Sequence, residues 1–279
     1  MQNIHGRTAI ITGGSRGIGA VVAQELARQG LNLALAARSE DELLATAKQL
    51  ELENNKAIIV PTDVTDVDQA QNLVDRTVDE FGTVDILINN AGIERVFEFH
   101  KLAPKDIQRI IEVNLTSALV ISRLVLPVML KQKSGHIVNM ASLAGKFRPP
   151  HTQPYTSSKA GLIGFTSSLR AEFRHQGVSA SVICPGFVGD AGMFHRQKDE
   201  ASLQPTKLMG TSSAEGVARA VVKAIKKDKP EILINRGPIR IVTTLCEIFP
   251  GLPRVICKFA GVSDMLLQGA RTREKVEGV

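Results

Sequence analysis

The sequence predicts an α/β protein of the doubly wound class, in which helices cover both faces of a seven-stranded parallel sheet and a C-terminal helical extension follows. Two observations predict this class. Short β-branched and apolar runs alternate with segments of helical periodicity from the first residues onward. The short runs are apolar on both faces, as the strands of a buried parallel sheet must be. With 279 residues, the chain is long enough to form one large domain of this kind.

The expected elements follow the chain in order. Helices are expected at 18–26 and 43–50, where apolar residues recur at spacings of three and four, and at 104–131, 155–175 and 213–227. The segment 186–211 is expected to be an irregular cover or lid. The core domain spans 1–235, and 236–279 is an amphipathic extension rather than a separate domain. The expected strands are Thr8–Thr12, Asn32–Ala37, Ala57–Pro61, Ile86–Asn89, Gly135–Met140, 178–184 and Glu231–Ile234.

The composition excludes several classes of protein. A hydrophobic share of 43% and a charged share of 22% are typical of ordered globular chains. No run approaches the roughly 20 apolar residues of a membrane span, and the first residues lack the pattern of a secretory signal. Three widely spaced cysteines favour reduced thiols, a cytoplasmic location and no metal site. The whole net charge of +6 lies in residues 205–279, which favours a solvated basic face over a nucleic-acid or membrane contact.

A glycine-rich turn joins the first strand to the first helix. Its glycines at 13, 17 and 19 allow a tight turn, a close approach to a pyrophosphate and packing of the helix on the sheet. The turn therefore predicts a Rossmann-type dinucleotide site, although its G-x-x-x-G-x-G spacing differs from the common fingerprint. An NAD site carries an acid at the end of the second strand, where this chain has Ala36, Ala37 and Arg38. NADP(H) is therefore expected in preference to NAD(H), with Arg16 and Arg38 bound to its 2′-phosphate. The alternative is that both arginines are solvated surface residues.

The single tyrosine, Tyr155, precedes Lys159 by four residues and shares a helical face with it. A neighbouring ammonium stabilises a phenolate, which lowers its pKa toward the working range of a general acid or base. Such a pair is common by chance, so its surroundings carry the argument. Ser142 follows the strand Gly135–Met140 at the carboxyl end, where α/β sheets bind ligands. Asn114 lies inside the long predicted helix.

Taken in order, the glycine turn, the N-N-A-G motif at 89–92, the helical Asn114, Ser142 and Y-x-x-x-K resemble the short-chain dehydrogenase/reductase family over residues 6–235. The resemblance implies an NADP-preferring oxidoreductase that moves a hydride between nicotinamide and a carbonyl or secondary alcohol. It implies that Tyr155 is the proton donor or base and that Ser142 hydrogen-bonds the same oxygen. Lys159 would hold the nicotinamide ribose and lower the pKa of Tyr155, and Asn114 would anchor a water of the proton relay.

The resemblance also assigns the cofactor contacts. Two roles are possible for Asn89: it contacts the cofactor, or it links the central strands of the sheet. Asp190 stands where the family commonly has a threonine, so it either accepts from the nicotinamide carboxamide or points to solvent. The residues expected to touch the cofactor are Gly13, Ser15, Arg16, Ile18, Gly19, Arg38, Asp63, Val64, Asn90, Gly92, Tyr155, Lys159, Pro185, Gly186 and Val188.

The expected substrate is a small carbonyl or alcohol compound, a hydrophobic ketone or a 3-oxoacyl compound, because the candidate pocket walls are apolar. These walls are 93–99, 143–151 and 187–209, and include Phe97, Phe99, Leu143, Phe147, Phe187, Met193 and Phe194. His151 and His195 are more simply ordinary hydrogen-bonded side chains.

The basic, amphipathic stretch 238–260 has two possible uses. It lies on a membrane surface, or it covers the pocket or a neighbouring subunit, and packing within a homodimer or homotetramer is favoured. A non-catalytic NADP-binding regulator or scaffold is the alternative to an enzyme. Nucleic-acid binding is not expected, because the basic tail lacks tyrosine and tryptophan for stacking.

Overall fold

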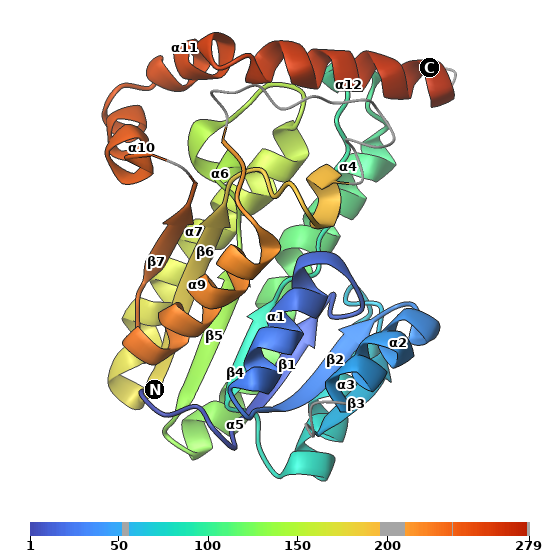
Figure 1. The fold of residues 1–279 in the computed structure, drawn as a ribbon, viewed down its shortest axis with the longest axis vertical. Helices are drawn as coiled ribbons and strands as arrows, with labels where there is room; N and C mark the ends of the chain where they lie inside the picture. Colours follow the sequence, from blue (N-terminus) through green and yellow to red (C-terminus); the bar gives the residue numbers. More distant parts are fainter. Residues whose placement is uncertain (52–55, 196–209, 236, 278–279) are drawn as a thin grey trace.

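A computed structural model describes residues 1–51, 56–195, 210–235 and 237–277. Seven strands form one parallel sheet in the order β3-β2-β1-β4-β5-β6-β7, which confirms the doubly wound fold (Figure 1). The order reverses between β1 and β4, so a crevice opens there at the carboxyl ends of the strands. The strands are β1 (Thr8–Thr12), β2 (Asn32–Ala37), β3 (Ala57–Pro61), β4 (Ile86–Asn89), β5 (Gly135–Met140), β6 (Val178–Pro185) and β7 (Glu231–Ile234).

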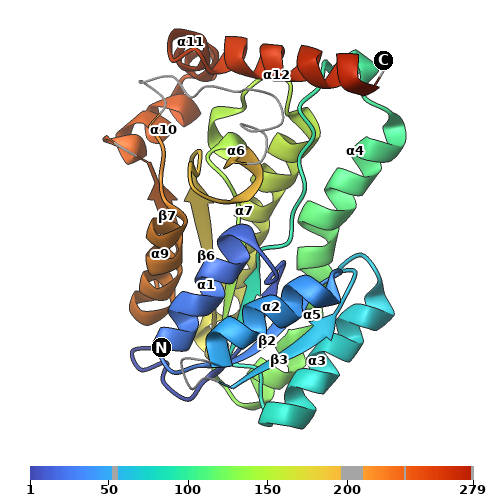
Figure 2. The ribbon, with the colours of Figure 1, turned by 45° about the vertical axis from the view of Figure 1, so that its right-hand side comes forward.

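Helices cover both faces of the sheet (Figures 1 and 2). Successive strand residues point to opposite faces, so Ile11 packs under α1, α2 and α9, whereas Ile10 packs under α3, α5 and α7. The core helices are α1 (Gly17–Arg28), α2 (Glu40–Glu51), α3 (Val67–Phe81), α4 (Pro104–Ile111), α5 (Ser117–Lys131), α6 (Ala144–Phe147), α7 (Gln153–Phe173) and α9 (Ala214–Lys227), with short turns η1 (Phe99–Lys101), η2 (Glu112–Thr116) and η3 (Arg174–Gln176).

Helix α3 was not among the expected helices, although its ends are well marked. The Asp66 side chain accepts from the backbone N–H groups of Asp68 and Gln69 at the helix start. Gly82 ends the helix with a φ of 76°, a left-handed conformation that glycine adopts without strain. The apolar face of α3 is narrow, so its caps are a better signal than its apolar spacing.

The long helix expected over 104–131 is interrupted by the π-helical turn η2 between α4 and α5. By length and composition this segment could cross a membrane, because its most apolar window of 18 residues has a mean hydropathy of 1.8. Half of its most apolar window is buried. Ile121, Val125 and Met129 of α5 are fully buried against the sheet. Packing in the protein core therefore accounts for the apolar character of this helix.

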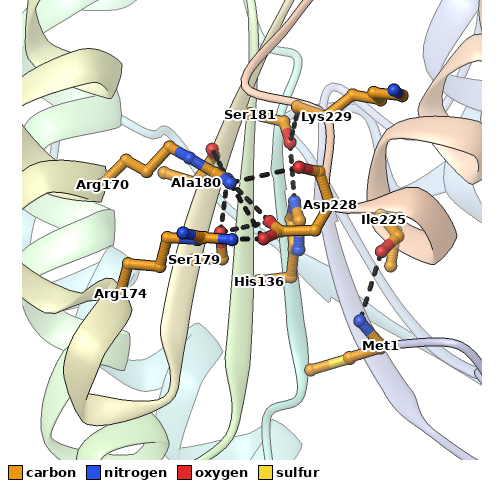
Figure 3. Close-up of polar contacts among 10 residues, drawn as sticks. All are labelled: Met1, His136, Arg170, Arg174, Ser179, Ala180, Ser181, Ile225, Asp228 and Lys229. Atoms are coloured by element: carbon orange, nitrogen blue, oxygen red, sulfur yellow. Dashed lines mark hydrogen bonds and ion pairs between the residues drawn. The ribbon is translucent and has the colours of Figure 1, made fainter.

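A polar network closes the amino end of the sheet, on the side opposite to the crevice (Figure 3). Arg170 of α7 donates two hydrogen bonds, of 2.6 and 2.9 Å, to the carboxylate of Asp228 in the turn before β7. Burial opposes ionisation of Asp228, but hydrogen bonds from Arg170, Ser179 and Arg174 outweigh it and lower the pKa. The imidazole of His136 lies 2.8 Å from the Ser181 hydroxyl, and burial lowers the pKa of His136 to about 3. The network joins α7, β6 and the β7 turn.

The C-terminal extension lies across the carboxyl ends of the strands (Figures 1 and 2). It forms three helices, α10 (Ile239–Ile248), α11 (Leu252–Phe259) and α12 (Val262–Glu277). Helix α12 is fastened to the segment after β4, because Glu274 accepts from the Glu98 N–H at 3.1 Å and from Lys101 Nζ at 2.7 Å. Met265 and Leu266 pack in an apolar cluster with Val96. The extension therefore covers the crevice.

Candidate active site

The glycine turn has the shape of a phosphate cradle. Gly13 and Gly17 have φ values of 64° and 58°, which glycine alone adopts readily. A Cβ on Gly19 would overlap the carbonyl oxygen of Gly13, so the turn can close only with glycine there. Asn90 fixes the turn from β4, because its side-chain amide donates to the carbonyl oxygens of Thr12 and Gly13 at 3.1 Å each. The Asn90 side chain, which was expected to lie near a ribose, therefore also supports the turn.

A groove of about 630 Å³ runs beside this turn. Its lining includes one residue from the C-terminal extension, Arg273 of α12. The free backbone N–H groups at the start of α1, next to the glycine turn, fit the pyrophosphate of a dinucleotide. A side chain at Gly13 would collide with Asn90 and Ala91, so glycine is needed for the turn to pack against the end of β4. The expected cofactor residues that line it are Gly13, Ser15, Arg16, Ile18, Gly19, Arg38, Asp63, Val64, Asn90 and Gly92.

Glu42 brings a carboxylate to the adenosine end of the groove, where the sequence at 36–38 showed none. Its two oxygens accept from the Ser15 hydroxyl and from the Arg16 guanidinium, each at 2.9 Å. Helix α2 turns Glu42 toward the glycine turn, four residues beyond Arg38. Position along the chain did not reveal this contact, because it depends on how α2 packs. This end of the groove therefore holds two cations, Arg16 and Arg38, and one acid, Glu42.

Asp63 marks the far edge of the groove, next to Val64. Its carboxylate accepts from the Thr65 backbone and hydroxyl at 3.0 and 2.8 Å and from Arg109 at 2.8 Å. Desolvation opposes ionisation, but these hydrogen bonds outweigh it and hold the pKa of Asp63 below its usual value. Asp63 is therefore a fixed, ionised acceptor at the edge of the groove.

Ser142, Tyr155 and Lys159 meet at the end of the groove. Tyr155 is 8% exposed and lies beside Ser142, whose Oγ accepts from the Ala144 N–H at 3.1 Å and donates to the Pro185 carbonyl oxygen at 3.5 Å. Lys159 is buried one helical turn further on, and its Nζ lies 5.5 Å from the centre of the Tyr155 ring. Lys159 Nζ donates to the Met140 carbonyl oxygen at 2.8 Å. Ser142 and Tyr155 line the same cavity, where a substrate oxygen can reach both hydroxyls.

The electrostatics of this cluster differ from the sequence-based expectation. Burial raises the pKa of Tyr155, and the negative charge of Glu94 adds to this effect more than the Ser142 hydrogen bond offsets it. Burial likewise lowers the pKa of Lys159 to about 8. The expectation that Lys159 lowers the pKa of Tyr155 was therefore wrong for the protein by itself. The reason is desolvation of the phenol: the amine of Lys159, with its pKa of about 8, has lost its positive charge before a phenol with a raised pKa begins to ionise.

Asn114 lies in the π-helical turn η2, a distortion that often marks functional sites. Its side chain is buried and pairs with the Ile93 backbone, accepting from the N–H at 2.7 Å and donating to the oxygen at 2.8 Å. It also donates to the Ser158 hydroxyl at 3.2 Å. Gly92 lies directly beside Asn114 and Lys159. Asn114 therefore fixes the chain segment that faces Lys159.

The sequence left two possible roles for each of Asn89 and Asp190, and the structure shows the contacts of both side chains. The Asn89 amide donates to Asn139 at 2.8 Å and to Ser122 at 3.1 Å, so it ties β4 to β5 and α5. Asp190 is exposed to solvent, and one oxygen of its carboxylate accepts from the Ala214 N–H at 2.9 Å. This contact satisfies a free donor at the start of α9, where a negative charge is favourable.

A second cavity, of about 330 Å³, continues from the catalytic hydroxyls into the fold. Pro185, Gly186 and Val188 line it rather than the cofactor groove. The described lining does not include His151, His195, Phe97 or Phe99, and 196–209 lies outside the described residues. The expected wall residues that line the cavity are Leu143, Phe147, Phe187, Met193 and Phe194, and the extension adds Pro238, Ile239, Val242, Ile256, Cys257, Ala260, Val262 and Leu266.

The fold and the site together define an oxidoreductase class. A sequence model described as short chain dehydrogenase matches residues 7–202. The chain belongs to the short-chain dehydrogenase/reductase family, which supports an enzyme that acts on a carbonyl or an alcohol with a nicotinamide cofactor.

Individual relatives refine this picture. The ketoacyl reductase HetN of a Nostoc species is 38% identical over 99% of this chain and 96% of its own. This match extends through the C-terminal extension. An actinorhodin polyketide ketoreductase with NADPH covers 82% of this chain and 96% of its own, with a TM-score of 0.77 and 28% identity. A family member from Burkholderia phymatum with NAD covers 90% and 96%, with a TM-score of 0.80 and 31% identity.

Proposed function

We propose that this protein is an NADP(H)-dependent reductase of hydrophobic 3-oxoacyl compounds. The observation that carries the proposal is the apolar cavity of about 330 Å³ that begins at Ser142 and Tyr155 and meets the cofactor groove at Ile18, Asn90, Glu94 and Met193. A cavity of this size suits a ligand of moderate length. HetN is by its name a ketoacyl reductase, and the other relative is a ketoreductase of a polyketide, which supports this substrate class.

The mechanism follows from the two hydroxyls. Ser142 and Tyr155 bind and orient the carbonyl oxygen, and Tyr155 donates its proton as negative charge develops there. A bound nicotinamide supplies the hydride. Because burial raises the pKa of Tyr155, its hydroxyl keeps the proton at neutral pH. Tyr155 therefore holds the proton that the reduction of a carbonyl consumes, and we propose that the protein works as a reductase.

The preference for NADP(H) is part of this proposal. Arg16 and Arg38 both line the adenosine end of the groove, and guanidinium groups suit phosphate. Glu42 opposes a second phosphate charge but is itself paired with Arg16. The net charge of these three side chains is positive, which supports a 2′-phosphate. The complete set of Ser142, Tyr155 and Lys159 leaves the alternative of a non-catalytic scaffold without a supporting observation.

The test is the initial rate of NADPH oxidation with 3-oxoacyl thioesters of increasing chain length. Each methylene buried in the cavity stabilises the complex by about 0.8 kcal/mol, so kcat/KM rises about fourfold per methylene until the cavity is full. Val242→Phe fills part of the cavity and shifts the optimum to shorter chains. Val255→Phe, the same change on the exposed side of α11, leaves the optimum in place. A rate independent of chain length would contradict the assignment of this cavity to the acyl chain.

A further inference from the structure

Helices α10 and α11 expose large apolar side chains on faces that do not line the cavity. On α11, Val255 and Phe259 are four residues apart and share one row, and Phe259 is 81% exposed. The opposite side of the same helix carries Ile256, Cys257 and Ala260, which line the cavity. A helix that is apolar on both sides is typical of one covered on both sides. The exposed members of this outer face are Ile241, Leu245, Ile248, Phe249, Val255 and Phe259.

Cations lie beside these apolar rows. Arg254 and Lys258 are exposed and form a row next to Val255 and Phe259 on α11. In the stretch 238–260 the sequence has one acid, Glu247. Its carboxylate is paired with Arg148 at 2.9 Å, so its charge is balanced locally. The outer face is therefore both apolar and positively charged.

The combination of apolar and positively charged side chains distinguishes between two possible partners for this face, a second copy of the chain and an anionic lipid surface. A second copy docked through the same face about a two-fold axis would bring the Arg254 and Lys258 rows of the two copies together, and like charges at such a contact are unfavourable. An anionic lipid surface attracts the same cations, at about 1 kcal/mol for each one near the headgroups. Apolar rows flanked by cations are also the pattern of helices that lie in a membrane interface.

We propose that the outer face of α10 and α11 docks on an anionic bilayer surface, with Val255 and Phe259 inserted at the boundary between headgroups and acyl chains. The cavity lies on the other side of α11, about 10 Å from the lipid, which is the width of a helix. A lipophilic substrate therefore enters from the membrane rather than from water. The docking proposal places the protein on the membrane surface, and it does not depend on which carbonyl compound is the substrate.

The proposal is tested by sedimentation of the full chain with lipid vesicles, which does not depend on catalysis. We expect binding to vesicles that contain phosphatidylglycerol and little binding to pure phosphatidylcholine. Removal of two charges in Arg254→Gln/Lys258→Gln weakens binding about 25-fold, and Phe259→Ser weakens it as well. Lys223→Gln/Lys227→Gln removes the same charges at the same spacing from α9 and leaves binding unchanged. Val276→Ser is the control for Phe259, because Val276 is 82% exposed on α12.

Four results would overturn the proposal. The first is a lack of sedimentation with either vesicle. The second is a dimer in analytical ultracentrifugation that Phe259→Ser dissociates while vesicle binding stays absent, which would assign the face to a second copy. The third is binding of an acidic acyl carrier protein that needs Arg254 and Lys258 but not Phe259, without vesicle binding. Equal loss in the control variants would also contradict it, since the effect would then be one of general charge or stability.

Discussion

Substitution of Glu42 should change the preference of the protein for NADPH over NADH. Its carboxylate accepts from Ser15 and Arg16 at 2.9 Å each, and it lines the groove where a 2′-phosphate would lie. Replacement by glutamine keeps the shape and removes one negative charge. We expect Glu42→Gln to bind NADPH more tightly and NADH about as well as the unaltered protein, because only NADPH carries a charge at the 2′ position.

The size of the effect follows from the exposure of the pair. The side chains of Arg16 and Glu42 are 59% and 37% exposed, so water screens their charges. Two unit charges about 4 Å apart interact by about 1 kcal/mol in water. A phosphate carries close to two charges, and salt screens part of the interaction. The preference for NADPH over NADH should therefore rise about five- to tenfold.

The assay is a fluorescence titration of each reduced cofactor at two salt concentrations. Glu40→Gln is the matched control, because Glu40 lies in the same first turn of α2 and does not line the groove. The gain for Glu42→Gln should shrink at high salt. An unchanged or weaker affinity of Glu42→Gln for NADPH would refute the placement of the 2′-phosphate next to Arg16.

Three further predictions concern single residues. Arg38→Ala should weaken the binding of NADPH at least about tenfold and leave the binding of NADH unchanged. An equal loss of affinity for both cofactors in titrations would show that Arg38 serves the fold. Tyr155→Phe should lower turnover by about 10² or more with little change in NADPH affinity, and full activity would contradict the proton-donor role. Stability should fall as the pH drops from 6.5 toward about 3, because the unfolded chain binds a proton that native His136 does not. His136→Asn should remove up to about 1.4 kcal/mol per pH unit from this slope in urea unfolding, and equal slopes would count against the buried neutral imidazole.

The fold was largely predictable from the sequence because each strand is a short apolar run. All seven strands lie where they were expected, and β6 extends one residue further, to Pro185. Helix α3 was missed because its signal lies in its caps, Asp66 and Gly82, rather than in apolar spacing. The C-terminal helical extension was expected, but the contacts that seat α12, among them the Glu274 bonds to Lys101 and to the Glu98 backbone, depend on tertiary packing and could not be predicted.

The candidate site was predictable where contacts follow the chain and unpredictable where they depend on packing. The glycine turn and the pair Tyr155 and Lys159 are local patterns. Glu42 and Glu94 reach the site only because α2 and the segment after β4 fold over it. Burial is a property of the whole fold, so the sequence alone suggested the wrong direction for the pKa of Tyr155.

The most direct test of the central claim is thermal unfolding with saturating NADPH, NADP⁺, NADH or NAD⁺. A ligand that binds only the folded protein raises the unfolding temperature by mass action, so the test needs no substrate. The account predicts a clear rise with NADPH and NADP⁺ and a smaller rise with NADH and NAD⁺. A larger rise with NADH would contradict the roles of Arg16 and Arg38, and no rise with any of the four would contradict the assignment of the groove to a nicotinamide cofactor.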